Sequence, residues 1–261
     1  MNVNPEELRF GGIDRLFGHK GRARLQNACV MVVGVGGVGS WTVEALARSG
    51  VGHLILVDLD DVCVSNTNRQ LHALGSTVGK QKVDVLKQRC LDISPSAEIK
   101  TEHQFATASS IPTLLKHQPT VVIDAIDQPK NKCLLLHECR NLNIDIVTVG
   151  AAGGLQDPTK IDVVDLNHAY NDKLLKRVRK SLRQDFGWPR GDKRWKISAV
   201  FSSELPIFPG ENGEICTTPA QSGPTKLDCA SGFGAATFVT GTFGFFAAHL
   251  AVRKIVNKSK G

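Results

Sequence analysis

Short apolar runs alternate with helical patterns along the first 150 residues. Four runs, mostly of β-branched residues, are typical of strands buried on both faces of a parallel sheet. They cover residues 28–33, 54–57, 121–125 and 146–149. The stretches between them have helical patterns, at 38–48, 80–93, 109–116 and 129–142. This alternation predicts an α/β fold with a Rossmann-like, doubly wound and mostly parallel sheet.

The pattern changes after residue 150. A glycine-rich stretch at 150–158 is followed by strand-like patterns at 161–166 and 195–201, which flank a basic helix. Residues 206–224 are rich in Pro, Gly and polar side chains and predict a loop. Residues 235–252 are apolar except for His249 among ionisable side chains, and their length approaches that of a membrane span. Their small residues favour a buried helix over a membrane anchor.

A glycine turn, Gly34-Val35-Gly36-Gly37-Val38-Gly39, directly follows the first predicted strand and opens the first helix. Glycines at this place let backbone N–H groups approach a diphosphate, and the helix N-terminus adds positive dipole density. Asp58 ends the second strand, where a carboxylate accepts hydrogen bonds from ribose hydroxyls. The order of these elements predicts a nucleotide site; glycines that merely permit close packing are the alternative.

Charged residues near this turn favour ATP over NAD. Arg69 is suited to bidentate phosphate contact, and Lys80 and Lys82 supply further positive charge. Asp127 follows the strand at 121–125, where a carboxylate is a natural magnesium ligand. The alternatives are a surface ion pair for Arg69, an exposed helix position for Lys82 and a helix N-cap for Asp127. No P-loop motif occurs, and an NAD-dependent oxidoreductase is the competing interpretation.

The net charge of +7 is concentrated in one segment. Residues 171–196 hold ten basic and three acidic residues, while the other 22 basic and 22 acidic residues cancel. A polyanion such as RNA would gain from counterion release there; a solvated helix face is the alternative. The candidate RNA-binding residues are Lys173, Lys176, Arg177, Arg179, Lys180 and Arg183.

The turn, the run at 58–70, Lys82 and Asp127 together resemble the ThiF/HesA/MoeB adenylyltransferases, which are relatives of the ubiquitin-activating enzymes. The resemblance implies a dimeric Rossmann-like domain that binds ATP and Mg²⁺ and joins AMP to a carboxylate. Asp58 would hold the ribose, with Asp60 also binding the nucleotide. Asn66, Arg69 and Lys82 would contact the phosphates, and Asp127 would organise magnesium.

The same resemblance assigns Arg15 to the ATP of a partner subunit, so a homodimer is expected. The alternative for Arg15 is an exposed helix arginine. Longer stretches at 9–18, 60–74, 121–127, 147–161 and 228–245 resemble one branch of the family, the tRNA threonylcarbamoyladenosine dehydratases. That likeness implies ATP-dependent cyclisation of threonylcarbamoyladenosine beside the tRNA anticodon. Activation of the C-terminal carboxylate of a sulfur-carrier or ubiquitin-like protein is the alternative.

The seven cysteines have neither a C-x-x-C pair nor the spacing of a disulfide scaffold. We therefore expect no zinc and a reducing cytoplasm. We interpret Cys229 as a buried, inert residue; a thioester or persulfide carried by it, with a cysteine desulfurase or sulfur acceptor as partner, is the alternative. A monovalent cation near Asp228 is left open.

The chain is long enough, and at 41% hydrophobic residues apolar enough, to form one α/β domain over residues 1–261. We expect residues 1–150 to bind the nucleotide. Residues 151–261 would bind the RNA substrate and contribute to dimerisation. No secretory signal opens the sequence.

Overall fold

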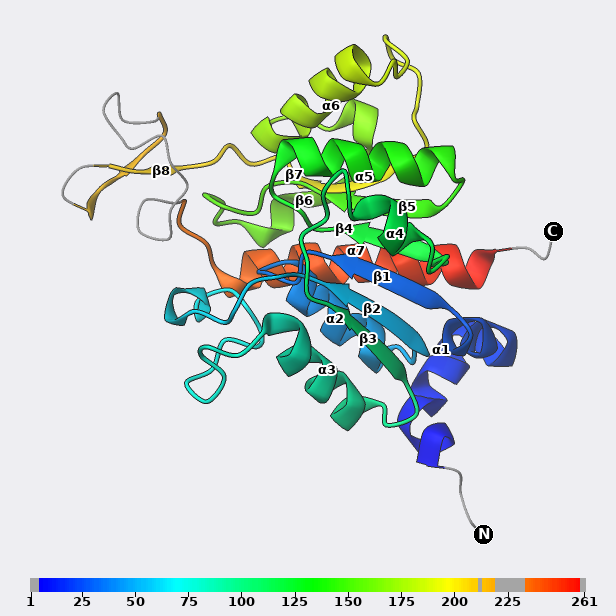
Figure 1. The fold of residues 1–261 in the computed structure, drawn as a ribbon. Coiled ribbons are helices and arrows are strands. Elements are labelled where there is room, and N and C mark those ends of the chain that lie inside the picture. Colours follow the sequence, from blue (N-terminus) through cyan, green and yellow to red (C-terminus); the bar gives the residue numbers. More distant parts are fainter. Residues whose placement is uncertain (1–4, 211–212, 219–232, 259–261) are drawn as a thin grey trace.

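A seven-stranded sheet forms the centre of the protein (Figure 1). The computed structural model describes residues 5–210, 213–218 and 233–258. The strand order is β3-β2-β1-β4-β5-β7-β6, and every pair is parallel except the antiparallel β6 and β7. The strands are β1 Cys29–Val33, β2 His53–Val57, β3 Glu98–Glu102, β4 Val121–Asp124, β5 Asp145–Val149, β6 Ile161–Asp165 and β7 Ser198–Ser202. The predicted α/β fold with a mostly parallel sheet is confirmed.

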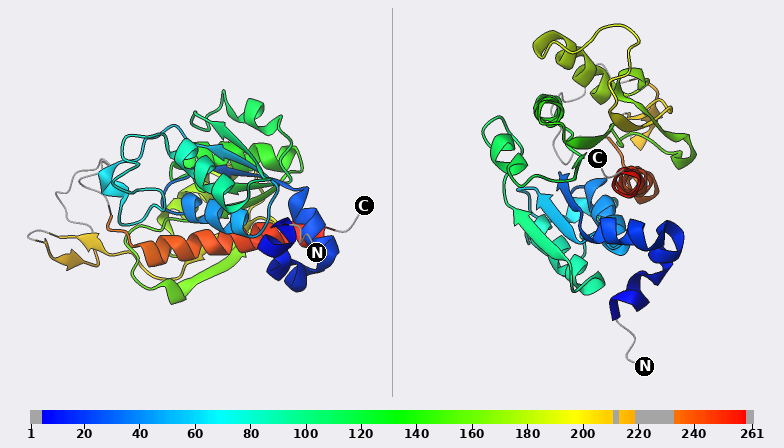
Figure 2. Two further views of the ribbon diagram at one scale, coloured as in Figure 1. Left: turned by 90° about the horizontal axis from the view of Figure 1, so that it is seen from below. Right: turned by 90° about the vertical axis from the view of Figure 1, so that its right-hand side faces the viewer.

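Helices cover both faces of this sheet (Figure 2). One face packs against α1 Pro5–Gln26, α2 Gly39–Arg48, α3 Lys82–Ile93 and α7 Thr237–Asn257. The other face packs against α4 Ile111–Leu115, α5 Pro129–Asn141 and α6 Lys173–Asp185. Short 3₁₀ helices lie in the described connections: η1 Val64–Asn66, η2 Pro158–Lys160 and η3 Leu166–His168. Each face of the sheet therefore has its own apolar core, which is why the central strands are apolar on both sides.

Some boundaries differ from the sequence prediction for local reasons. The pattern gave no strand at β3, because β3 lies at the sheet edge and only Ile99 of its five residues is buried. The strand predicted at 195–201 begins at Ser198, because Lys196 has a φ of +61° and interrupts the extended backbone.

The segment predicted as a loop at 206–224 contains two short antiparallel strands, β8 Phe208–Pro209 and β9 Ile215–Cys216. Its residues 211–212 and 219–224 lie outside the described part of the chain.

The apolar C-terminal helix is packed within the fold. α7 buries Val239, Phe243 and Ala247 in the core shared with α2. A Cβ added at Gly244 would lie 2.7 Å from the Val38 carbonyl oxygen, so this glycine permits close approach of the two helices. The prediction of a buried helix is confirmed. Within the described ranges, no helix has the length and apolar character needed to cross a membrane.

Candidate nucleotide-binding site

The predicted site segments meet at the carboxyl edge of the sheet. β1 and β4 are neighbours there, with β2 and β3 on one side and β5 on the other. A doubly wound sheet binds ligands in the crevice at this switch point. The glycine turn follows β1, Asp58 follows β2, and Asp127 comes shortly after β4. The fold thus places these three groups on one edge.

Two glycines of the turn occupy positions that exclude a larger residue. Gly34 has a φ of +84°, and an added Cβ would lie 2.9 Å from the Ala125 carbonyl oxygen. At Gly39, the first residue of α2, an added Cβ would lie 1.9 Å from the Gly34 carbonyl oxygen. The turn is therefore folded tightly onto itself and onto the segment that leaves β4.

The other two glycines lie beside polar side chains. An added Cβ would lie 3.7 Å from the Gln70 amide nitrogen at Gly36 and 3.6 Å from Arg69 Cγ at Gly37. These distances place the side chains of Arg69 and Gln70 against the turn. A basic and an amide side chain thus stand where a phosphate would meet the N-terminus of α2.

Asp58 ties the turn to the end of β2. Its Oδ2 accepts a hydrogen bond from the Val35 N–H at 2.8 Å, and its Oδ1 accepts one from the Asp60 N–H at 3.0 Å. The residue is 8% exposed. Carboxylate oxygens accept more than one hydrogen bond each, so these contacts leave capacity for a ribose hydroxyl.

The start of α7 holds the backbone of the segment that carries Arg69. The Arg69 carbonyl oxygen accepts hydrogen bonds from Trp41 Nε1 at 3.1 Å and from Thr240 Oγ1 at 3.2 Å. Thr237 Oγ1 donates to the Asn68 carbonyl oxygen at 2.6 Å. A C-terminal element therefore positions a residue of the N-terminal half, and nothing in the sequence pattern predicted this.

Arg69 and Asn66 shape the same loop. The Arg69 guanidinium donates to the Ser65 carbonyl oxygen at 2.7 Å and to Asn68 Oδ1 at 2.9 Å. Both acceptors are neutral, so these two bonds do not neutralise the guanidinium charge. Asn66 is buried, and its Oδ1 accepts from the Cys63 N–H at 3.0 Å. Its contact with phosphate stays a prediction, while its contact with the loop is structural.

Lys82 and Asp60 form a partly buried ion pair. The Lys82 side chain is 6% exposed, and its Nζ lies 2.8 Å from Oδ2 of Asp60, whose side chain is 52% exposed. The alternative of an exposed helix position is therefore wrong for Lys82. Lys82 is the first residue of α3, and Asp60 fixes the position of its ammonium group.

Two buried polar side chains to which the sequence analysis assigned no role, Gln70 and His72, follow Arg69 in the chain. Gln70 is 8% exposed and its Oε1 has no hydrogen-bond partner among the described residues. His72 is 1% exposed, and neither ring nitrogen has a partner there either. Burial lowers the pKa of His72 to about 4, with a further contribution from the Lys82 charge. The imidazole is therefore neutral at pH 7. The alternation of Gln70 and His72 with apolar neighbours is a weak sequence signal, because many loops share it.

Asp127 is exposed and does not cap α5, because the N-cap residue is Gln128. The N-cap alternative is therefore wrong. Among the described residues, no group of three His, Cys, Asp or Glu side chains could hold a metal ion. A single exposed carboxylate beside the glycine turn fits Mg²⁺, which proteins commonly hold through one or two carboxylates together with nucleotide phosphates and water.

Arg15 belongs to α1, which lies at the amino edge of the sheet, whereas the glycine turn lies at the carboxyl edge. It is an exposed residue of α1, and α1 ends just before the amino end of β1 (Figure 1). The glycine turn follows the carboxyl end of β1, roughly 16 Å further on for a five-residue strand. The structure therefore does not bring Arg15 to the site of its own chain. Cys229 and Asp228 lie outside the described residues.

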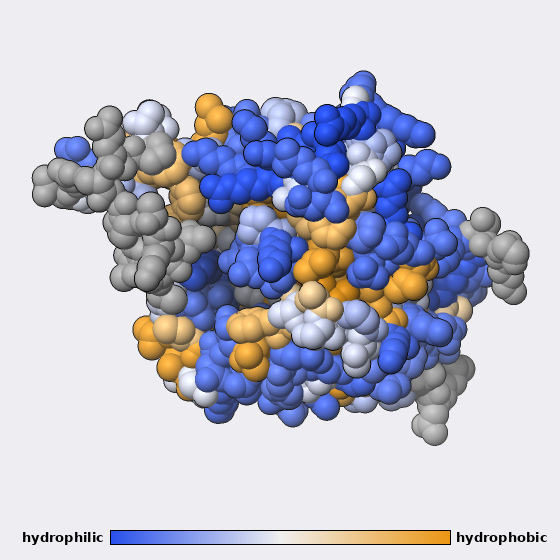
Figure 3. All heavy atoms as spheres, turned by 45° about the horizontal axis from the view of Figure 1, so that its top comes forward, coloured by the Kyte–Doolittle hydropathy of each residue, from blue (hydrophilic) through white to orange (hydrophobic). Residues whose placement is uncertain are grey.

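The basic helix begins at the same edge as the turn. Asp172, the N-cap of α6, accepts hydrogen bonds from the N–H groups of Leu175 at 2.8 Å and of Ala151, just after β5, at 2.9 Å. The buried side of α6 is apolar. Lys173, Lys176, Arg177 and Lys180 are exposed on the other side. Strongly hydrophilic side chains accordingly predominate in the upper part of the surface in Figure 3.

Three of the six candidate RNA-binding residues also contact the protein. Lys173 lies over the Phe208 ring, 4.6 Å from its centroid. Arg183 hydrogen-bonds Asn167 Oδ1 and lies 5.2 Å from the centroid of the buried Trp195. Arg179 is half-buried, and burial followed by the Arg183 charge lowers its pKa. Lys176, Arg177 and Lys180 are exposed and take no part in these contacts.

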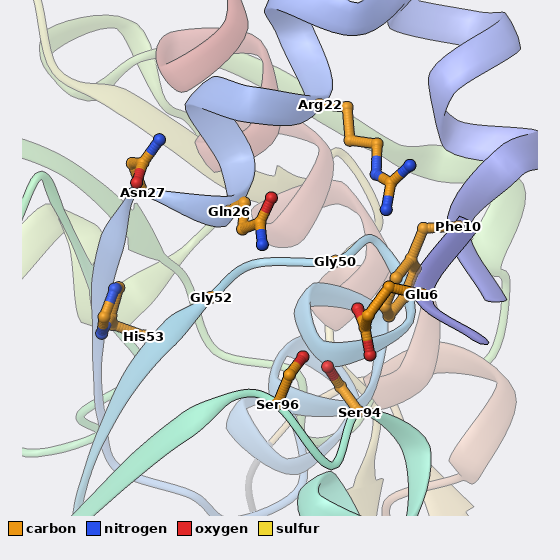
Figure 4. A pocket seen from close by; sticks show the side chains of 10 residues that line it. All are labelled: Glu6, Phe10, Arg22, Gln26, Asn27, Gly50, Gly52, His53, Ser94 and Ser96. Carbon is orange, nitrogen blue, oxygen red and sulfur yellow. The ribbon is translucent and has the colours of Figure 1, made fainter. Parts of the chain in front are cut away.

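A hollow at the amino edge of the sheet is a separate feature (Figure 4). Phe10 and Arg22 of α1 lie on one side of this hollow. On the other side are the turn before β2, with Gly50 and Gly52, and the turn before β3, with Ser94 and Ser96. None of the predicted nucleotide-binding residues lines this hollow.

Comparison with known proteins gives a consistent result over nearly the whole chain. The ThiF family model matches residues 13–260. The tRNA threonylcarbamoyladenosine dehydratase of Escherichia coli K12 is 44% identical over 96% of this chain and 94% of its own length. The protein of the same name from Haemophilus influenzae is 45% identical over 98% and 96%, respectively.

A solved structure extends the likeness to three dimensions. The E. coli tRNA N6-threonylcarbamoyladenosine dehydratase TcdA, in complex with ATP, superposes with a TM-score of 0.86 at 39% identity. The match covers 98% of this chain and 96% of that one.

Proposed function

The chain belongs to the ThiF family, and on that premise we propose that it dehydrates threonylcarbamoyladenosine in tRNA, next to the anticodon, at the expense of ATP. The observation that carries the proposal is a pair of cations near the phosphate-binding turn, Arg69 directly against it and Lys82 linked to it through Asp60 and Asp58. Arg69 lies against Gly37 and has no carboxylate partner among the described residues, and Lys82 is held at the start of α3 by Asp60. An oxidoreductase that binds a dinucleotide has little need of these charges, whereas an enzyme that binds a triphosphate needs them to neutralise the phosphates. The near-full-length likeness to tRNA threonylcarbamoyladenosine dehydratases supports the substrate.

The reaction follows from the chemistry of a carboxylate. A carboxylate resists attack because its oxygen is a poor leaving group, and transfer of AMP from ATP converts that oxygen into a good one. Attack of the carboxylate oxygen on the α-phosphorus forms the acyl-adenylate and releases pyrophosphate. A nucleophile of the same modified base then attacks the activated carbonyl and expels AMP. The ring closes, and the nucleoside has lost one water.

Each protein group has a defined task in this scheme. The N-terminus of α2 and the turn bind the phosphates, and Asp58 holds the ribose. Arg69 and Lys82 stabilise the charge that develops as pyrophosphate leaves, with Asn66 a further phosphate contact. Mg²⁺, which Asp127 would hold, supplies additional charge neutralisation on the phosphates when bound. Ring closure is intramolecular, with effective molarities of roughly 10⁵–10⁸ M for well-oriented groups, so it requires no covalent enzyme intermediate.

The RNA would dock on α6. The helix presents Lys176, Arg177 and Lys180 to solvent, and its N-terminus lies at the edge of the sheet that carries the glycine turn. Backbone phosphates bound there would bring the anticodon region toward the adenylation site.

The site would be completed by a second copy of the chain. Arg15 lies at the amino edge and does not reach the turn of its own chain, so its proposed contact with ATP requires a homodimer in which it acts on the partner's nucleotide.

The test is AMP formation by purified protein with ATP, Mg²⁺ and tRNA that carries the modification. AMP should form in step with cyclised nucleoside, and unmodified tRNA should not replace the substrate. Pyrophosphate exchange that responds to a sulfur-carrier protein but not to modified tRNA would identify a protein tail as the substrate instead. Tight NAD binding without ATP binding would contradict both assignments.

A further inference from the structure

A lysine without exposed surface lies next to the segment that carries Asp127. Lys132 belongs to α5, and both its side chain and that of Asp124, at the end of β4, are 0% exposed. Burying a charge is costly unless it is paired and hydrogen-bonded. The residue therefore needs a structural explanation that the sequence pattern does not provide.

Three acceptors surround the Lys132 ammonium. Its Nζ lies 3.0 Å from Asp124 Oδ2, and it donates to the carbonyl oxygens of Asp124 at 3.2 Å and Ile126 at 2.9 Å. An ammonium has three N–H donors. All three are therefore occupied by the turn at residues 124–126, and none is left for a substrate.

The Asp124 carboxylate completes the network. Its Oδ2 also accepts from Thr148 Oγ1 of β5 at 2.7 Å, and its Oδ1 accepts from the Ile126 N–H at 3.2 Å. Burial raises the pKa of the Asp124 carboxyl, and the Lys132 charge opposes this effect. The backbone ladder between β4 and β5 already pairs Asp124 with Thr148, so the Thr148 hydroxyl only adds to that link, whereas among the described residues Lys132 alone ties the carbonyl groups of Asp124 and Ile126 to α5.

This turn contacts the glycine turn and leads to Asp127. The Ala125 N–H donates to the Val33 carbonyl oxygen at 2.9 Å, and the Ala125 carbonyl oxygen is the atom that an added Cβ at Gly34 would meet. Asp127 follows Ile126 directly. A shift of the 124–126 turn would therefore move both the support of the phosphate-binding turn and the proposed magnesium ligand.

We propose that Lys132 is a positioning residue of the nucleotide site: its buried ammonium holds the 124–126 turn so that Asp127 stands at the phosphates. The proposal rests on the proposed function, in which Asp127 organises magnesium. Lys132 itself is not a catalytic residue, because it has no exposed surface and no free donor.

Three variants separate positioning from bulk stability. Lys132→Met removes the donors and leaves Asp124 unpaired. Asp124→Asn combined with Lys132→Met removes both charges and so avoids an unpaired buried carboxylate. Thr148→Val is the matched control, because it removes a buried hydrogen bond to Asp124 but leaves the Lys132 bonds to the carbonyl oxygens in place.

The readouts are the affinity for Mg·ATP by calorimetry and the hydrogen exchange of the Ala125 and Ile126 amides in nucleotide-free protein. Mutations of groups that orient metal ligands typically weaken binding about 10–100-fold. We expect a loss in that range, with faster exchange, for both Lys132 variants. Thr148→Val should melt at a lower temperature yet keep both values within about twofold.

The double variant decides the outcome. Mg·ATP affinity and amide exchange equal to the wild type would overturn the proposal. Exchange in the wild type provides an independent check that needs no variant to fold: the two amides should open only with the whole domain, and fast local exchange would also overturn it. If wild-type protein bound Mg·ATP but formed no AMP, the proposed function would be wrong. The positioning role of Lys132 would still be decided by Mg·ATP affinity and amide exchange in the variants.

Discussion

The tight contact between Gly34 and Ala125 can be measured by comparing two glycines with nearly the same backbone angle. Gly34 has a φ of +84° and Gly79 a φ of +81°. A Cβ added at Gly34 would lie 2.9 Å from the Ala125 carbonyl oxygen, whereas one added at Gly79 would meet nothing within 4 Å. Gly34→Ala therefore combines backbone strain with a steric clash, and Gly79→Ala has the strain alone.

The two costs can be estimated separately. A left-handed backbone conformation costs an L-residue about 1–2 kcal/mol. Inserting a methyl group into a packed site costs about 1–3 kcal/mol more. We expect a loss in free energy of unfolding of about 1–2 kcal/mol for Gly79→Ala and of about 2–5 kcal/mol for Gly34→Ala. Most domains of this kind have enough stability to remain folded.

Urea unfolding measures the stability loss, and calorimetry with ATP measures the effect on the site. Gly34→Ala should weaken ATP binding about tenfold or more, equivalent to about 1.4 kcal/mol, because either the glycine turn or the Ala125 carbonyl must move. Gly79→Ala should bind ATP as the wild type does. Equal stability losses in the two variants, or wild-type ATP affinity in Gly34→Ala, would refute the proposed contact.

Three further predictions concern charge. Replacing Lys176, Arg177 and Lys180 by Ala should weaken tRNA binding and reduce the slope of log K against log salt by about 2–3. The control replaces the exposed Lys20, Lys116 and Arg253 by Ala, which should change this slope less. An unchanged slope in the first variant would exclude α6 as the docking surface. The pKa of His72 falls from 6.5 to about 4 on folding, so the unfolded chain binds a proton more readily than the folded one. The contribution of His72 to the free energy of unfolding is therefore fully present above pH 6.5, and about 3 kcal/mol of it is lost as the pH falls to 4. His72→Leu should flatten that part of a pH series of urea midpoints, and an unaltered pH slope would contradict the assignment. Mixing inactive Arg15→Ala and Lys82→Met proteins should restore AMP formation if subunits share sites, because a mixed dimer contains one intact site; no recovery after subunit exchange would exclude the shared arrangement.

The sequence predicted the parallel sheet well, because strands buried on both faces are continuously apolar and the helices between them are periodic. It also placed the glycine turn, Asp58 and Asp127 at one edge, since βα connections return the chain there. β3 escaped prediction because an edge strand with a single buried residue carries almost no apolar pattern.

The contacts that position the site were not predictable from local patterns. Thr240 holds the Arg69 backbone from 171 positions away, and a hydroxyl in an apolar helix gives no sign of its partner. Lys132 resembles any other helix lysine in the sequence, because only the packing of α5 against β4 and β5 reveals that it is fully buried. The roles of Arg15 and Cys229 remain predictions, since one concerns a second chain and the other lies outside the described residues.

In the proposed function, the glycine turn binds ATP so that AMP is transferred to the carboxylate of the modified nucleoside. Its most direct test is mass spectrometry of nucleosides after incubation of modified tRNA with the protein, ATP and Mg²⁺, together with quantification of AMP. We predict that the nucleoside loses the mass of one water and that one AMP appears for each nucleoside converted. An unchanged nucleoside mass, or conversion without AMP, would contradict the account.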